Sequence, residues 1–228
     1  MEVFMNSSLI TKRERVRALT ESAVMIAFAT ILSLLKLYEL PWGGSVTLAS
    51  MLPLVMIGYR HGLKWGLLSS LVYSLLQMLL GFGTISAAFL PGDDQMLWYN
   101  AVLMVLLDYF LAFSLVGLSG LFRKENKPSR SLAIGSLVGT TARFIMHFAS
   151  GWILWGAWAA SFFEGFDETT GGTFGAWIIN TFNGQALAAA YSFIYNGFYM
   201  IPEILITTLL AYFIGKIPTI AKTTTGNR

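Results

Sequence analysis

Three residues with ligand-binding chemistry recur at helical spacing in one long apolar segment. His147, Gly151 and Trp155 stand four residues apart between residues 143 and 158. On an α-helix they share one face, with a drift of about 40° per step of four. An imidazole, a position without a side chain and an indole would then face the same space, which suits a flat aromatic ligand. Asp108, in another apolar stretch, would add a negative charge that favours a cationic ligand.

Four ionisable residues fall inside segments that otherwise read as lipid-embedded. A charged side chain near the centre of a bilayer costs about 2.5–3.5 kcal/mol on insertion scales, so each needs a reason to be there. Structural explanations stay open. Asp108 could pair with Arg143, and Arg143 could instead extend toward the cytoplasmic face. His147 could be a hydrogen-bonded packing residue, and Glu203, which follows a proline, favours a bonded structural carboxylate.

A second stripe lies near the C-terminal end of the chain. Tyr191, Tyr195 and Tyr199 repeat every four residues, and Asn196 lies about 100° around the helix from Tyr195. Of these, Tyr191 and Asn196 could supply hydrogen bonds to a ligand. Asn196 could instead form a helix–helix hydrogen bond worth about 0.6–2 kcal/mol.

Two further features lie nearer the N-terminus. Trp42 stands in the glycine-containing turn at residues 41–45, where the backbone can approach a ligand closely, so we interpret it as a lid residue. Ala23 and Ala27 have the spacing of small residues that lets two helices approach each other. We interpret them as a docking face for a partner protein.

The composition of the 228-residue chain indicates a helical membrane protein. Its residues are 55% hydrophobic and only 12% charged, whereas soluble chains carry about 25% charged residues. The mean hydropathy is +0.63. The absence of cysteine excludes disulfides and thiolate chemistry. We predict no metal site, no cofactor and no nucleic-acid partner, and the N-terminus has no cleavable signal pattern.

The hydropathy pattern predicts a single all-α membrane domain over residues 1–228, with six spans. A basic segment over 1–18 precedes them, a long external loop covers 159–186 and a tail covers 215–228. Basic residues gather at both ends of the chain and in alternate connections, which places both termini in the cytoplasm. The six spans lie near residues 19–37, 46–59, 62–80, 97–121, 131–158 and 187–214.

Several stretches together resemble one family, the thiamine-specific substrate-binding (S) components of energy-coupling factor (ECF) transporters, of the ThiT/YuaJ type. The resemblance runs in order from about residue 18 to 215. Its motifs are Gly43-Gly44-Ser45-Val46, Gly62-Leu63-Lys64-Trp65-Gly66-Leu67, Leu107-Asp108-Tyr109, Arg143-Phe144-x-x-His147-Phe148-x-x-Gly151 with Trp155-Gly156, and Tyr191-Ser192-x-x-Tyr195-Asn196 with Tyr199-Met200-x-Pro202.

The resemblance implies a six-helix cell-membrane protein that captures extracellular thiamine. It also implies a separate transmembrane coupling protein and two cytoplasmic ATPases that drive reorientation. The residues that it assigns to vitamin binding, to closure of the site or to partner docking are Trp42, Tyr73, Asp108, Tyr109, His147, Gly151, Trp155, Tyr191, Asn196, Ala23 and Ala27. Some relatives carry Glu at the position of Asp108 and Trp at that of Tyr73. The loop 159–186 is longer than the family leads us to expect.

Thiamine suits these side chains because its thiazolium ring carries a permanent charge beside a flat aminopyrimidine. A buried cation needs a negative or π-rich partner, and stacking on Trp155 could add about 0.5–2 kcal/mol of cation–π attraction. No dense anion-binding group is expected on the external side, so a phosphorylated vitamin should fit less well.

Three alternatives stay open. An intramembrane enzyme could use Asp108, Tyr109 and His147 for acid–base chemistry, although no metal-binding His pair or nucleophile elbow accompanies them. A solitary ion-coupled transporter is disfavoured because six spans without an inverted repeat do not fit alternating access by one subunit. An S component for another small cationic or pyrimidine-type vitamin precursor is the alternative that the sequence discriminates least.

Overall fold

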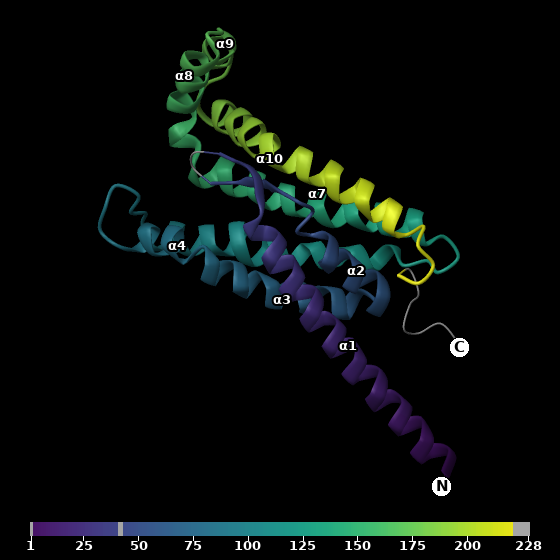
Figure 1. Cartoon of the computed structure of the whole chain (residues 1–228). Coiled ribbons are helices and arrows are strands. Elements are labelled where there is room, and N and C mark those ends of the chain that lie inside the picture. The colour runs from purple at the N-terminus through teal and green to yellow at the C-terminus, as the bar shows by residue number, and fades with distance from the viewer. Residues whose placement is uncertain (1, 41–42, 221–228) are drawn as a thin grey trace.

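The computed structural model describes residues 2–40 and 43–220, which form a helical bundle with one small two-stranded sheet (Figure 1). The sheet is the one departure from the all-α prediction. In chain order the elements are α1 (Glu2–Leu34), β1 (Lys36–Glu39), β2 (Ser45–Thr47), α2 (Leu52–His61), α3 (Leu63–Leu80), α4 (Phe82–Phe89), α5 (Trp98–Met104), the π-helix η1 (Val105–Leu111), α6 (Ala112–Ser114), the 3₁₀ helix η2 (Leu115–Phe122), α7 (Pro128–Leu154), the 3₁₀ turn η3 (Gly156–Trp158), α8 (Ala159–Thr170), α9 (Phe174–Thr181) and α10 (Gly184–Ile214).

Five helical segments of the described residues are long and apolar enough to cross a bilayer, which confirms the prediction of a multi-pass membrane protein. They are Lys12–Leu34, Leu63–Leu80, Trp98–Phe122, Pro128–Leu154 and Gly184–Ile214. The segment expected as the second span instead contains α2, whose ten residues measure about 15 Å against a hydrocarbon core of about 30 Å. Its residues from Leu52 to Tyr59 are buried. Helix α2 is therefore an interior helix of the bundle.

Glycines let the helices around η2 approach closely. A Cβ placed on Gly66 of α3 would lie 2.8 Å from the carbonyl oxygen of Gly117 in η2, and one on Gly139 of α7 would lie 2.6 Å from that of Val116. Neither position has room for a larger side chain. Small residues at helix contacts are the usual way to pack helices in a membrane, where lipid provides no hydrophobic drive for association.

The first predicted span ends earlier than expected, at Leu34, and the chain continues as the antiparallel hairpin of β1 and β2. Glu203 of α10 fixes this hairpin, since its carboxylate accepts bonds from the Thr47 backbone N–H at 2.7 Å and the Thr47 hydroxyl at 2.8 Å. The hydroxyl of Tyr195 adds a second link by donating to the carbonyl oxygen of Gly43 at 2.6 Å. The interpretation of Glu203 as a bonded structural carboxylate is confirmed.

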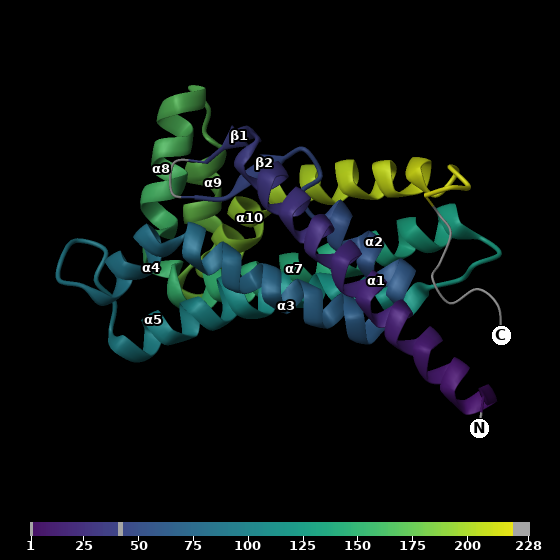
Figure 2. The same cartoon turned by 60° about the horizontal axis from the view of Figure 1, so that its bottom comes forward.

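Different elements lie at the two ends of the bundle. Helix α1 begins and α10 ends at one end, while α8, α9 and the connection between α4 and α5 lie at the other (Figures 1 and 2). Helices α7 and α10 run side by side through most of their length (Figure 1). The side chains that could bind a ligand come largely from these two helices.

The segment 159–186 differs from the predicted semi-ordered loop with one short helix. It contains two helices, α8 and α9, and the first residues of α10. The physical reason lies in its aromatic residues. Phe162 and Phe163 are buried beside α10 rather than exposed in a loop, and Phe163 is 0% exposed. These contacts give the polar, glycine-rich segment a core of its own.

Candidate functional site

A cavity of about 830 Å³ opens among α3, α4, η1, α7, α10 and the β1–β2 hairpin. Its volume is in the range of small-molecule binding sites. The structure brings eight of the nine predicted ligand-binding residues to its wall, and the ninth, Trp42, lies outside the described residues. The eight are Tyr73, Asp108, Tyr109, His147, Gly151, Trp155, Tyr191 and Asn196.

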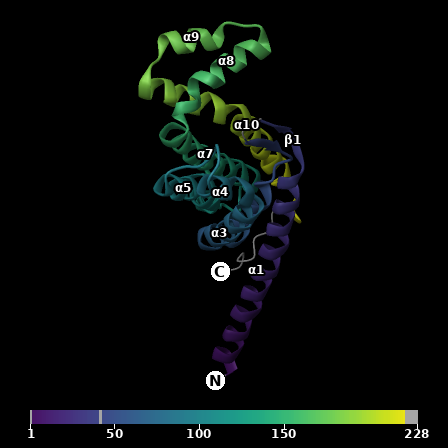
Figure 3. The same cartoon turned by 90° about the vertical axis from the view of Figure 1, so that its left-hand side faces the viewer.

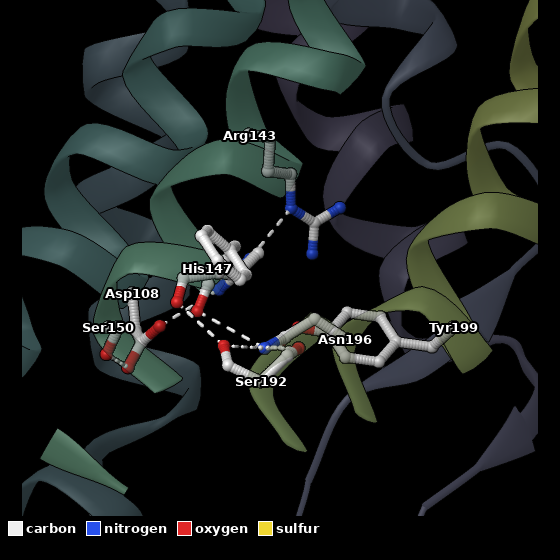
Figure 4. A network of polar contacts seen from close by, with 8 residues as sticks. Asp108, Arg143, His147, Ser150, Ser192, Asn196 and Tyr199 are labelled. Carbon is white, nitrogen blue, oxygen red and sulfur yellow. Dashed lines mark hydrogen bonds and ion pairs between the residues drawn. The ribbon is translucent and has the colours of Figure 1, made fainter. Parts of the chain in front are cut away.

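Asp108 and His147 form the polar centre of this wall (Figure 4). One carboxylate oxygen of Asp108 lies 3.0 Å from Nδ1 of His147, and the other accepts a hydrogen bond from the Ser150 hydroxyl at 2.5 Å. A carboxylate offers about four lone-pair positions. Asp108 is therefore held in place by two protein contacts and can still accept hydrogen bonds from a ligand.

Arg143 sets the proton position on the imidazole. Its Nε–H donates to Nε2 of His147 at 3.2 Å, so Nε2 must be the unprotonated nitrogen and Nδ1 carries the hydrogen donated to Asp108. The guanidinium lies over the ring of Phe113, 4.5 Å from its centroid. The expected alternative of a direct pair between Asp108 and Arg143 is wrong, because the imidazole of His147 stands between them.

Asn196 joins α10 to α7. Its amide nitrogen donates to the carbonyl oxygens of His147 at 3.2 Å and Ser192 at 2.9 Å, while its amide oxygen accepts from the Tyr199 hydroxyl at 2.6 Å. Both amide hydrogens therefore have protein partners. Only the second lone pair of the amide oxygen remains for a ligand. The main role of Asn196 is therefore to hydrogen-bond α10 to α7, which orients the cavity wall.

Gly151 serves the same contact between α7 and α10. A Cβ at this position would collide with the Ser192 hydroxyl and would lie 3.0 Å from the amide nitrogen of Asn196. The sequence suggested an open space for a ligand over Gly151. Gly151 does line the cavity, but a side chain at this position would meet α10, so the glycine also allows α10 to approach α7.

Aromatic rings form the wall on the side of α8. Trp155 directly follows the last residue of α7, so it caps this helix and is not a regular member of the predicted stripe. Tyr191 and Tyr195 of α10 lie with ring centroids 5.6 Å apart. Phe162 of α8 packs behind both, at 5.3 Å from Tyr191 and 5.6 Å from Tyr195. The helices α8 and α9 thereby support the cavity from outside.

Tyr73 and Tyr109 complete the opposite wall. Tyr73 of α3 is fully buried and meets the ring of Phe113 edge to face at 5.5 Å. Tyr109 follows Asp108 in the π-helix η1. A π-helical turn inserts one extra residue and shifts the side chains around the axis, and such turns are frequent at functional sites. This winding allows two consecutive polar residues to reach the same cavity.

Sequence reasoning missed several residues of the cavity wall. Arg143 was considered only as a structural residue, and Tyr195 and Tyr199 were noted as a stripe but not assigned to the site. Their four-residue spacing with Tyr191 was the signal that could have included them. Further lining residues carried no sequence signal of their own, among them Thr47, Ser50, Gln77 and Phe113.

The predicted docking residues Ala23 and Ala27 lie apart from this cavity. Both are exposed on α1. Exposed apolar neighbours accompany them, including Val24 and Phe28. The surface is thus open to lipid or to another helix.

A multi-pass membrane protein with a preformed cavity of aromatic and ionisable side chains has the architecture of a small-molecule binding or transport protein. Residues 19–166 match the family model described as "Thiamine transporter protein (Thia_YuaJ)". The chain belongs to this family. Because its members are transporters, the alternative of an intramembrane enzyme is wrong.

Individual relatives agree with this assignment. The chain is 28% identical over 204 residues to "Thiamine transporter ThiT" of Bacillus subtilis (strain 168), covering 84% of this chain and 86% of that protein. It is also 28% identical over 156 residues to the ThiT of Lacticaseibacillus paracasei, covering 61% and 68%. A solved structure of ThiT from Listeria monocytogenes superposes with a TM-score of 0.64 at 22% identity, over 91% of this chain and 98% of that one, and supports the fold.

Proposed function

We propose that this chain captures extracellular thiamine in its cavity, as the substrate-binding subunit of an ECF-type vitamin importer. The observation that carries the proposal is the gathering of a carboxylate, an imidazole and several aromatic rings around one cavity. Thiamine offers a matching set of a cationic ring, a flat aminopyrimidine and a hydroxyl group. The names of the relatives support the same ligand.

Each group of thiamine has a partner in this arrangement. Asp108 offsets the thiazolium charge, and Trp155 supplies an aromatic face worth about 0.5–2 kcal/mol of cation–π attraction. Tyr109 and Tyr191 bind the polar edges of the vitamin, while His147, whose two ring nitrogens are bonded within the protein, contacts the vitamin through its ring. The contacts from His147 and Ser150 hold the side chain of Asp108 in position at the cavity wall, so little reorganisation accompanies binding.

The surrounding walls close the site. Tyr73 forms the buried aromatic side, and Asn196 holds α10 in register with α7. We assign Trp42, which lies between β1 and β2 in the sequence and outside the described residues, the role of a lid. The links from Tyr195 and Glu203 to this hairpin limit how far the hairpin can move while the cavity is occupied.

Transport requires partners that are separate chains. We propose six membrane passages, with α2 counted as a short interior one, and both termini in the cytoplasm, as the distribution of basic residues favours. A coupling membrane protein docks on the face of α1 that carries Ala23 and Ala27, and two cytoplasmic ATPases drive reorientation of the subunit. The cavity then opens toward the cytoplasm.

A titration with thiamine tests the binding step. Detergent-purified protein is titrated while intrinsic tryptophan fluorescence is recorded, in parallel with the variants Trp155→Ala and Asp108→Asn. The matched control is Glu168→Gln, which removes an exposed carboxylate of α8 away from the cavity. Saturable quenching that both site variants lose and the control keeps supports the proposal. Folded protein without any response refutes thiamine as the ligand and favours another cationic or pyrimidine-type vitamin.

A second experiment separates binding from transport. Ala23→Trp should abolish thiamine uptake by the full complex while binding by the isolated subunit stays intact. Ala157→Trp, exposed at the other end of the bundle, should impair neither. Thiamine accumulation in vesicles that hold only this chain and an ion gradient would refute the multi-subunit mechanism.

A further inference from the structure

Helices α8 and α9 form a self-contained hairpin rather than a loose connection. Helix α8 ends at Thr170, and the next residue, Gly171, has a positive φ of 66° that allows the chain to reverse. The carboxylate of Asp167 then accepts the backbone N–H groups of Gly175 at 2.7 Å and Ala176 at 2.8 Å. These bonds cap the start of α9 and fix the angle between the two helices.

The hairpin projects sideways from the bundle. It lies beyond α7 and α10, on the side opposite α3, and both the front view and the view from the end show this displacement (Figures 1 and 3). Helix α8 starts five residues after α7 ends. Trp152 and Trp158, at this junction, are both exposed, and Trp158 also lines the cavity. Exposed tryptophans at the end of a membrane helix mark the membrane–water interface, so the hairpin leaves the bundle at that depth.

An aromatic strip connects the hairpin to the lipid-facing side of α10. Phe166 of α8 stacks on Phe198 of α10, with centroids 5.9 Å apart and planes at 19°. Phe174 of α9 follows at 6.0 Å from Phe166, and Trp177 at 6.0 Å from Phe174. Phe198 is 42% exposed within a membrane-spanning helix, and Trp177 is 57% exposed. The strip is therefore an unbroken extension of a surface that lipid covers.

Polar residues occupy the other side of α8. Glu164 and Glu168 are exposed, and at 100° per residue they lie roughly opposite Phe162 and Phe166. A helix with acidic residues on one side and aromatic rings on the other suits the boundary between lipid and water. A hairpin standing free in water would expose the aromatic strip without compensation.

We infer that the α8–α9 hairpin lies in the membrane–water interface, with Phe166, Phe174 and Trp177 inserted among lipid headgroups and Glu164 and Glu168 in water. The occupant of the aromatic surface is the lipid bilayer. With both termini in the cytoplasm, as proposed above, the hairpin lies in the outer leaflet. Its position at the interface does not depend on which ligand the cavity binds. Because Phe162 packs against Tyr191 and Tyr195, the bilayer then supports one wall of the cavity through this hairpin.

The absence of native cysteine allows a direct test with single spin labels. The full chain carrying Trp177→Cys, Phe174→Cys or the matched control Glu168→Cys is labelled and reconstituted into phosphatidylcholine–phosphatidylglycerol vesicles. Power-saturation EPR compares collisions of each label with oxygen, which enters lipid, and with a water-soluble nickel chelate. We expect positions 174 and 177 to favour oxygen and position 168 to favour the nickel chelate.

Two outcomes would overturn the inference. Labels at 174 and 177 that meet the nickel chelate as often as the label at 168 would place the hairpin in water. Labels protected from both reagents would show that protein, not lipid, covers the strip. The two strip positions serve as independent variants if one of them impairs folding, and a thiamine titration of the labelled proteins keeps this test separate from that of the binding site.

Discussion

Replacing Asp108 with asparagine removes the negative charge from the cavity while keeping nearly the same shape. The asparagine oxygen can still accept the Nδ1–H of His147, and its amide can donate to the Ser150 hydroxyl, which is free to rotate. The local fold should therefore survive. What is lost is the attraction between the carboxylate and the thiazolium cation.

The size of this loss follows from the electrostatics of the site. Two unit charges about 4 Å apart attract by about 4 kcal/mol at an effective dielectric constant of about 20. The wild-type carboxylate also loses hydration when the ligand covers it, which offsets part of that gain. We expect thiamine binding to weaken by about 2–4 kcal/mol, or roughly thirty- to seven-hundredfold.

Calorimetric titration of wild type and Asp108→Asn with two ligands provides the assay. One ligand is thiamine, and the other is a neutral analogue in which a thiophene ring replaces the thiazolium. The wild type should prefer thiamine, and the variant should lose most of that preference. Asp94→Asn, an exposed carboxylate at the cavity wall, is the control and should change little because water screens its charge.

An equal loss of affinity for both ligands would refute the reasoning. Asp108 would then act by positioning His147 rather than by recognising charge.

Three further substitutions test the framework around the site. Gly151→Val should lower the free energy of unfolding by about 1–3 kcal/mol, because the new side chain separates α7 from α10; thermal melting measures it. Glu203→Leu should leave the buried N–H of Thr47 without its acceptor, at a cost of about 1–3 kcal/mol, and hydrogen exchange at Thr47 should accelerate. Tyr195→Phe removes the hydroxyl that binds Gly43 and should raise the dissociation rate of thiamine about fivefold, for a bond worth about 1 kcal/mol.

The first two of these substitutions have a matched comparison variant, and Tyr195→Phe has a contrary outcome of its own. Gly83→Val faces open space and should not affect unfolding as Gly151→Val does. If Glu203→Gln, which retains one acceptor, destabilised the protein as much as Glu203→Leu, the hydrogen bond to Thr47 would not be the cause. Unchanged dissociation in Tyr195→Phe would mean that the hairpin does not control release.

The sequence predicted the membrane class and much of the cavity wall, for identifiable reasons. A long run of apolar residues indicates a membrane-spanning helix, whichever neighbouring helices it packs against. The four-residue spacing of His147 with Gly151, and of Tyr191 with Tyr195, places side chains on one face of α7 and on one face of α10 once both are helices. What these residues do for a ligand is still a prediction, because geometry brings them together without revealing their roles.

Other features depend on contacts that are distant in sequence. The β1–β2 hairpin is held by Glu203 and Tyr195, more than 150 residues away, so residues 36–39 resembled the end of a span. The π-helical turn at Asp108 is a shift of hydrogen bonds that composition does not encode. Helix α8 is stabilised by the packing of Phe162 against Tyr191 and Tyr195 of α10 and against the buried Phe163, and the sequence of a polar segment does not reveal such contacts.

The bonds between α7 and α10 have a consequence for the route by which a ligand leaves. Asn196 binds the carbonyl oxygen of His147, and the Ser192 hydroxyl binds that of Phe148 at 2.7 Å, so the two helices move as one unit. The β1–β2 hairpin packs against α10 far less extensively than α7 does. An exit path should therefore open by displacement of the hairpin, and a covalent staple between α7 and α10 should leave ligand exchange unimpeded.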